Sequence, residues 1–345
     1  MLFALRKSLP LVTGLLSGLL VASAAAAAQA GWRQLSIPAI TSSAEAVVVA
    51  LYYPTQAPAR VIAMGPFNVN VAIQGAPDSQ FKGLIVLSHG VGGTELGHSS
   101  LAEALARDGW LVAALRHPGD NYRDRSLVQK GAARYFTERP QHVSHVIDAL
   151  LSDPQWRDRI GRDTVGPRIG AVGHSAGGYT VLALAGGEPD LSRLATHCAQ
   201  AGTEDPIFCG LARASQSTSN PVRPESPAPS LADPRVRAVV ALAPTGVLFS
   251  ASSLAAIRIP TAIYEAEQDR FLVPRFHAEW IARNLPGTEL HRVPNAWHFA
   301  FMDSPSMAIV TEDGDVAANP PGFDRSEFLA RLGREIPAFF AKALP

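Results

Sequence analysis

The stretch Ile169–Tyr179 reads IGAVGHSAGGY and combines a short apolar strand, a tight turn and the start of a helix. The apolar residues before Gly173 are typical of a buried strand, and the apolar run after Gly178 is typical of a buried helix. Between the two lies the pattern G-x-S-x-G, formed by Gly173, Ser175 and Gly177, with one other residue on each side of the serine. The stretch therefore predicts a serine on a sharp strand-to-helix turn inside an α/β sheet.

This context predicts a nucleophile elbow, in which the serine occupies a strained turn and its hydroxyl is exposed above the sheet. Gly173 and Gly177 are expected where a Cβ atom would collide with the neighbouring backbone. The helix that follows would direct its N-terminal N–H groups towards the same place. The alternative is a glycine-rich turn with an incidental serine, and two later parts of the chain favour the catalytic interpretation.

A serine hydroxyl is a poor nucleophile at neutral pH, so it needs a base and a carboxylate that orients the base. In such sheets the three groups follow the chain order serine, acid, histidine. After Ser175, Asp269 lies just past one predicted strand and His298 just past the next, and both are predicted to be catalytic. Glu267 is the second choice for the acid, and Asp303 is a distant third.

Acyl transfer also needs two N–H donors for the oxyanion that forms. The backbone of Ala176 is expected to supply one, because this residue follows the nucleophile. Val91, in the glycine-rich loop after the predicted strand that ends at Ser88, is expected to supply the other. His89 and His174 flank this centre and are expected to shape the pocket or hold loops, without transferring protons.

Apolar runs of strand length alternate with segments of helical periodicity over most of the chain. This order predicts an α/β fold with a mostly parallel central sheet flanked by helices, preceded by antiparallel strands. Strands are predicted over residues 46–53 (ended by Pro54), 61–64, 69–73, 83–88, 110–115, 236–243, 260–265 and 289–293. Helices are predicted over residues 99–108, from Pro140 onward, over 276–284 and after Asp324. Asp324 and Glu327 have the spacing of a capping box at the start of the last helix.

The first thirty residues have the pattern of a signal peptide. Arg6 and Lys7 precede an apolar core at Leu11–Val21, and Ala28–Ala30 is a small-x-small cleavage site, so the mature chain is expected to begin at Gly31. A retained membrane anchor is the alternative, but the apolar run is short for a membrane span. Residues 31–345 are predicted to form one exported domain, periplasmic or secreted, with no stable membrane span after processing.

Residues 186–235 differ from the rest of the domain, since they are rich in proline and small polar residues and show little periodicity. They follow the predicted nucleophile helix, where a cap over the pocket can be inserted, and a cap-like insertion is predicted here. A surface excursion is the alternative. Cys198 and Cys209 lie in this segment and, after a signal peptide, are expected to form a disulfide; a catalytic cysteine is the less favoured alternative.

Composition narrows the function further. The formal net charge of the 345 residues is zero, and no basic run suggests a nucleic-acid partner. A hydrophobic content of 47% and a charged content of 17% suit a globular enzyme with a large core. The expected partner is a small-molecule substrate.

With these features together, the chain resembles the serine α/β-hydrolases known as predicted dienelactone hydrolases, which are similar to the plasma-type platelet-activating factor acetylhydrolases. The resemblance runs from about residue 45 to the end. It is carried by Ser88–Gly92 (SHGVG), Gly173–Gly178 (GHSAGG), Asp269 within EQDRFLVP, His298 within WHFAF, and Pro320–Asp324 (PPGFD).

The resemblance implies an α/β-hydrolase fold and ester hydrolysis through a serine triad, with no metal and no cofactor. Two positions depart from the pattern. True dienelactone hydrolases use a cysteine nucleophile, whereas this chain has Ser175, and related sequences often have glycine before the catalytic histidine, whereas this chain has Trp297. Trp297 is a candidate wall of the acyl pocket.

The function expected from the sequence is an exported serine esterase that cleaves short-chain or lipid-like carboxylic esters. An amidase or peptidase that uses the same triad is the first alternative. A non-catalytic binding protein on the same scaffold is the second, and labelling of Ser175 by a fluorophosphonate would separate it from an enzyme.

Overall fold

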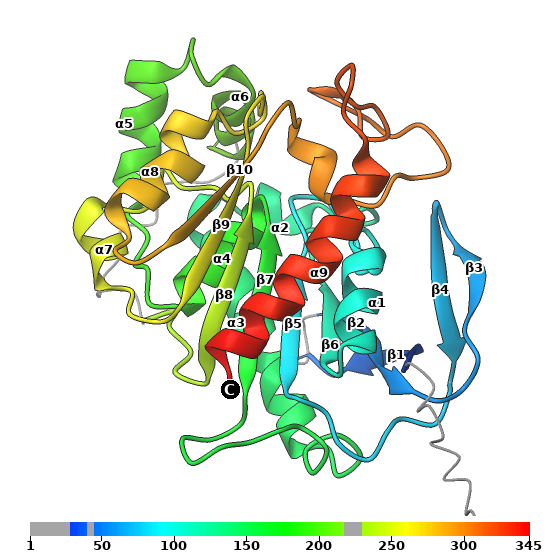
Figure 1. Ribbon diagram of the computed structural model, residues 1–345. Helices are drawn as coiled ribbons and strands as arrows, with labels where there is room; N and C mark the ends of the chain where they lie inside the picture. Colours follow the sequence, from blue (N-terminus) through cyan, green and yellow to red (C-terminus); the bar gives the residue numbers. More distant parts are fainter. Residues whose placement is uncertain (1–27, 40–44, 217–229) are drawn as a thin grey trace, which may run out of the picture.

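The computed structural model describes residues 28–39, 45–216 and 230–345. Within these residues the main sheet has ten strands in the order β10-β9-β8-β7-β5-β6-β2-β1-β4-β3, with helices on both faces (Figure 1). Most of the predicted signal peptide and residues 217–229 of the predicted insertion lie outside the described residues. No helix in the described ranges is both long and apolar enough to span a bilayer.

Six neighbouring strands of the sheet are parallel. Five of them are buried on both faces, which explains why four of these are mostly apolar in the sequence, whereas β10 at the edge of the sheet is partly exposed. The six strands are β5 (Leu84–Ser88), β6 (Leu111–Arg116), β7 (Ile169–His174), β8 (Val236–Leu242), β9 (Thr261–Ala266) and β10 (Glu289–Val293).

The strands from the N-terminal part extend this sheet and are mostly antiparallel, as predicted. β2 (Val47–Thr55) pairs antiparallel with β6 and with β1 (Gln29–Ile37), and β3 (Arg60–Met64) pairs antiparallel with β4 (Phe67–Ile73). β1 was not predicted. It begins two residues before the predicted start of the mature chain, and Gln29 and Ala30 already pair with β2.

The two faces of the sheet carry separate hydrophobic cores. In β2, for example, Val49 and Leu51 belong to one core, and Ala50 and Tyr52 belong to the other, because successive side chains point to opposite faces. α1 (Ser99–Arg107) and α9 (Arg325–Ala343) cover one face; α3 (Ala132–Ser152), α4 (Ala176–Leu184) and α8 (Ala278–Asn284) lie on the other (Figure 1). Asp324 caps α9 by accepting the Glu327 N–H at 2.9 Å, as the predicted capping box requires.

Two prolines lie inside elements whose ends they were predicted to mark. β2 continues past Pro54 to Thr55, which is tolerated because β6 pairs with β2 only as far as Tyr52. α3 begins at Ala132, eight residues before Pro140. Pro140 cannot donate to the carbonyl oxygen of Phe136, and the Tyr179 hydroxyl donates to that oxygen instead, at 3.0 Å.

The predicted insertion contains two helices, although its sequence shows little periodicity. α5 (Leu191–Ala201) and α6 (Pro206–Gln216) are joined by the predicted disulfide between Cys198 and Cys209. The remaining described elements are α2 (Ser126–Gln129), α7 (Ala251–Ala256), the 3₁₀ helices η1 (Pro274–Phe276) and η2 (His298–Phe301), and the short strands β11 (Val310–Thr311) and β12 (Gly314–Asp315).

Candidate active site

Ser175 occupies the turn between β7 and α4 in a strained conformation, with φ of 58° and ψ of −117°. A Cβ atom on Gly173 would collide with the carbonyl oxygen of Gly177, and one on Gly177 would collide with the carbonyl oxygen of Ser88. Gly173 is therefore needed for the turn to close against the start of α4, and Gly177 for it to pack against β5. A positive φ at a serine is costly and is typical of functional sites that the surrounding structure holds in place.

Asp269 and His298 meet at the carboxyl ends of β9 and β10. Asp269 Oδ1 accepts the backbone N–H groups of Phe271 and Leu272, both at 2.8 Å, and Oδ2 lies 2.7 Å from His298 Nδ1. Since a carboxylate only accepts, Nδ1 carries the proton and Nε2 is left with a free lone pair, as a general base requires. Both side chains are almost completely buried.

The other two acids considered from the sequence serve different purposes. Glu267 accepts the backbone N–H of Asn295 at 2.9 Å on the protein surface. Asp303 accepts the backbone N–H of Ser100 at 2.9 Å, in the first turn of α1. Asp269 is therefore the acid that contacts His298.

Ser175 and His298 border the same cavity. Among the described residues, no hydrogen bond joins the Ser175 hydroxyl to the His298 ring, and such catalytic hydrogen bonds often tighten only when substrate binds. The imidazole is held from both sides. The Phe271 ring stacks on it with centroids 4.9 Å apart and an interplanar angle of 14°, and the His174 ring lies 4.8 Å away.

The loop after β5 passes directly against the serine. A Cβ atom on Gly90 would lie 3.1 Å from Ser175 Cβ, a tight contact that glycine avoids. Val91 follows in the loop and borders both cavities at Ser175, and Ala176 is the first residue of α4. These positions fit the predicted oxyanion donors.

A buried network that was not predicted from the sequence braces this loop. Asp120 Oδ1 accepts the Gly92 N–H at 2.8 Å, and Asp120 Oδ2 accepts from the Tyr135 hydroxyl at 2.7 Å and from Arg139. Arg139, fully buried, also donates to the carbonyl oxygen of His89. Burial raises the pKa of Asp120, but the charge of Arg139 and the hydrogen bonds from Tyr135 and Gly92 act together against it and hold the pKa below its usual value. The position of Asp120 just after β6 was the one sequence signal for this role.

His89 and His174 lie beside the serine, and both are buried and held by hydrogen bonds. His89 accepts the His117 N–H at Nε2 (3.1 Å), so its Nδ1 donates to the Gly90 carbonyl oxygen at 2.6 Å. Burial, followed by the charge of Arg139, lowers the pKa of His89 to about 4. His174 Nε2 donates to the carbonyl oxygen of His298 at 3.0 Å. These contacts support the predicted roles of His89 and His174 in holding loops.

Trp297 does not have the position predicted for it. It lies outside the described linings of both cavities at Ser175, and the guanidinium of Arg270 lies 4.6 Å from the centre of its ring. The prediction that Trp297 walls the acyl pocket was therefore wrong. Phe271 is the aromatic residue that stacks on His298 and lines both cavities.

Two cavities of different size meet at Ser175. The smaller has a volume of about 90 Å³ and is lined almost entirely by apolar side chains, and the larger has a volume of about 1190 Å³ and a mixed lining. Ala176 borders only the smaller cavity, whereas His298 borders only the larger. The smaller cavity is lined by Val91, Val128, Ala132, Tyr135, Phe136, Ser175, Ala176, Leu194, Phe208, Leu211, Ala212, Thr245, Phe271 and Leu272.

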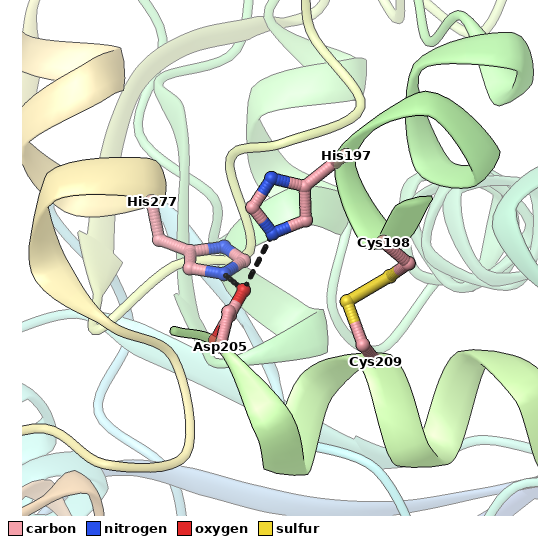
Figure 2. The surroundings of a disulfide bond; sticks show 5 residues. All are labelled: His197, Cys198, Asp205, Cys209 and His277. Atoms are coloured by element: carbon pink, nitrogen blue, oxygen red, sulfur yellow. Dashed lines mark hydrogen bonds and ion pairs between the residues drawn. A yellow bond between two sulfur atoms is a disulfide. The ribbon is translucent and has the colours of Figure 1, made fainter. Parts of the chain in front are cut away.

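A cluster of histidines and a carboxylate lies beside the disulfide (Figure 2). His197, Asp205 and Cys209 have ligand atoms within 4.8 Å of one another, but the Cys209 sulfur is bonded to Cys198 and cannot act as a thiolate. His277, which also contacts Asp205, accepts the Gly246 N–H at Nδ1 (3.1 Å), so its Nε2 carries the proton and cannot bind a metal. The donor set therefore fits a hydrogen-bonded cluster and does not fit a metal centre.

Comparisons with known proteins agree with this architecture. The model of the alpha/beta hydrolase family matches residues 85–312. A ferulic acid esterase from Streptomyces cinnamoneus superposes with a TM-score of 0.60 at 20% identity, covering 94% of this chain and 92% of that one. A dienelactone hydrolase from Anabaena variabilis superposes with a TM-score of 0.50 at 15% identity, covering 92% of this chain and 100% of that one.

No curated protein sequence matches the chain. At these identities the two solved structures establish the fold: a mostly parallel sheet flanked by helices, with antiparallel N-terminal strands. The family model covers about two thirds of the chain, from β5 to the turn after β11. The chain therefore belongs to the alpha/beta hydrolase family.

Proposed function

We propose that the protein is a serine hydrolase of carboxylic esters, with Ser175 as nucleophile, His298 as base and Asp269 as the orienting acid. The observation that carries this proposal is the 2.7 Å contact between Asp269 and His298, which leaves His298 Nε2 as an acceptor at the cavity that Ser175 borders. Membership of the hydrolase family supports a hydrolytic reaction.

In the proposed reaction, the Ser175 oxygen attacks the ester carbonyl carbon while His298 Nε2 takes the hydroxyl proton. The oxyanion is held by the backbone N–H groups of Val91 and Ala176. When the tetrahedral intermediate collapses, His298 gives its proton to the departing alcohol and an acyl-serine remains. Water, deprotonated by His298, then attacks the acyl-serine and releases the acid and the serine hydroxyl.

The two cavities assign the two halves of the substrate. The departing alcohol receives its proton from His298, so it must lie in the larger cavity, which His298 borders. The acyl chain then enters the smaller apolar cavity, whose 90 Å³ holds roughly six to nine heavy atoms at about 10–15 Å³ for each water-sized probe. The proposed substrates are therefore esters of short or medium acyl chains with larger alcohols.

The protein is also proposed to be exported by its signal peptide. The disulfide between Cys198 and Cys209 supports this, because disulfides persist in oxidising compartments.

Hydrolysis of a panel of p-nitrophenyl esters from acetate to dodecanoate tests the function. The enzyme is expected to cleave the shorter esters fastest, and Ser175→Ala is expected to lower kcat by about 10⁵–10⁶. Ser252→Ala, a change of an exposed serine in α7, is the matched control and should leave kcat unchanged. A folded Ser175→Ala variant with wild-type activity would refute the proposal.

A further inference from the structure

The acyl cavity is closed on one side by the insertion. Phe208, Leu211 and Ala212 of α6 and Leu194 of α5 line it, opposite residues of the central domain such as Phe271. The size of the cavity therefore depends on where α6 lies relative to the sheet. The contacts that hold α6 are candidates for setting which acyl chains fit.

One buried carboxylate makes the main polar link between α6 and the rest of the molecule. Asp205 immediately precedes α6 and is fully buried. Its Oδ2 accepts from His197 Nε2 of α5 at 2.8 Å and from His277 Nε2, at the start of α8, at 2.9 Å (Figure 2). Asp205 thus links α5 and α6 of the insertion to the start of α8 in the central domain.

The hydrogen-bond directions in this cluster are fixed. The Gly246 N–H donates to His277 Nδ1, so His277 can only donate through Nε2. Burial raises the pKa of Asp205, but hydrogen bonds from His277 and then from His197 outweigh it and hold the pKa below its usual value. An ionised carboxylate accepts hydrogen bonds more strongly than a neutral group does. The two histidine donors therefore bind strongly to the same oxygen of Asp205.

Aromatic ring contacts and the disulfide between Cys198 and Cys209 lie around the Asp205 cluster. Phe208 packs edge-on against His277 with centroids 4.8 Å apart, and Phe276 packs against His197 at 4.7 Å. Phe208 therefore both lines the acyl cavity and contacts a partner of Asp205. A shift at Asp205 would be transmitted directly to the cavity wall.

We propose that Asp205 determines acyl-chain selectivity, because it fixes α6 and so sets the depth of the acyl cavity. This inference rests on the proposed esterase function. Asp205 lies outside the linings of the described cavities at Ser175, and its role is to position Phe208 and its neighbours.

The test compares kcat/KM for p-nitrophenyl butyrate and decanoate in the full enzyme. Asp205→Ala leaves two donors without their acceptor, the buried His277 and the partly buried His197, so α6 should loosen and the decanoate-to-butyrate ratio should rise about tenfold or more. The change should appear mainly in KM, with kcat for butyrate close to wild type. Asp205→Asn keeps an oxygen that can accept from both histidines and should retain a ratio close to wild type.

The control is Glu204→Ala, which removes the neighbouring exposed ion pair with Arg275 and should leave the ratio unchanged. An unchanged ratio in folded Asp205→Ala, or equal loss on both esters, would overturn the inference while the proposed function stands. If Asp205→Ala does not fold, His197→Phe removes one donor at the edge of the cluster, and an unchanged ratio in that variant is equally contradictory. A wild-type enzyme inactive on every ester would overturn both proposals.

Discussion

Replacing Asp120 by asparagine should impair catalysis although Asp120 lies behind the loop and not in the cavity. All the hydrogen-bond partners described for the Asp120 carboxylate are donors: the Gly92 N–H on Oδ1, and Tyr135 and Arg139 on Oδ2. Asparagine has almost the same shape, but its NH₂ group must face a donor in either orientation. The substitution therefore either releases Gly92 from its acceptor or turns an amide towards Arg139.

The magnitude follows from what this loop holds. Gly92 follows Val91, a proposed oxyanion donor, and the loss of one such donor costs about 10²–10³ in rate. A loop that is displaced but still present should cost less, so we expect kcat to fall by about 10- to 100-fold. The uncompensated Arg139 should also lower the free energy of unfolding by about 3–5 kcal/mol.

The assay measures kcat and KM for p-nitrophenyl acetate in variants whose folding is checked by circular dichroism. The control is Arg134→Ala, which breaks an exposed ion pair with Glu138 on α3 and should change neither quantity. Folded Asp120→Asn with kcat within about twofold of wild type would refute the claim that this network positions the oxyanion loop.

Three further predictions concern other parts of the molecule. Asp269→Asn should lower kcat by about 10⁴. The asparagine oxygen must keep accepting the two backbone N–H groups, so the asparagine NH₂ faces His298 Nδ1 and the imidazole proton moves to Nε2. An unchanged pH–rate profile and kcat would contradict this. Burial lowers the pKa of His98 to about 3, so the unfolded chain binds a proton below about pH 6.5 that the folded chain does not, and His98 should cost about 1.4 kcal/mol of stability per pH unit as the pH falls. Urea titrations from pH 7.5 to 5 should therefore show a shallower loss of stability in His98→Phe than in wild type, and equal slopes would be inconsistent with a buried neutral His98. Cys198→Ser with Cys209→Ser opens a link of sequence separation 11 and should lower the free energy of unfolding by about 3 kcal/mol; an unchanged free energy would show that the thiols are unpaired in the purified protein.

The parallel sheet was predictable from the sequence because its inner strands are buried on both faces and are mostly apolar. β10 matches its predicted bounds of 289–293, and β5 differs by one residue. Asp269 and His298 were predictable for a related reason, since the carboxyl ends of neighbouring parallel strands meet at one edge of the sheet. The Asp269–His298 contact follows from this rule and from chain order.

Other features depended on contacts that are distant in the sequence. The start of α3 was misplaced because Pro140 favours a helix start, and its cost in the helix interior is offset by Tyr179, a residue that the local sequence could not reveal. The roles of Asp120 and Arg139 could not be derived either, because 19 residues separate them along the chain and their partners lie in a third segment.

Fluorophosphonate labelling followed by peptide mass spectrometry tests the central claim most directly, because it asks whether one serine is activated by one histidine. The account predicts a single adduct on Ser175, no adduct in Ser175→Ala, and labelling slowed by at least about 10³ in His298→Ala. An adduct on another residue, or labelling of Ser175 at the wild-type rate in His298→Ala, would contradict it.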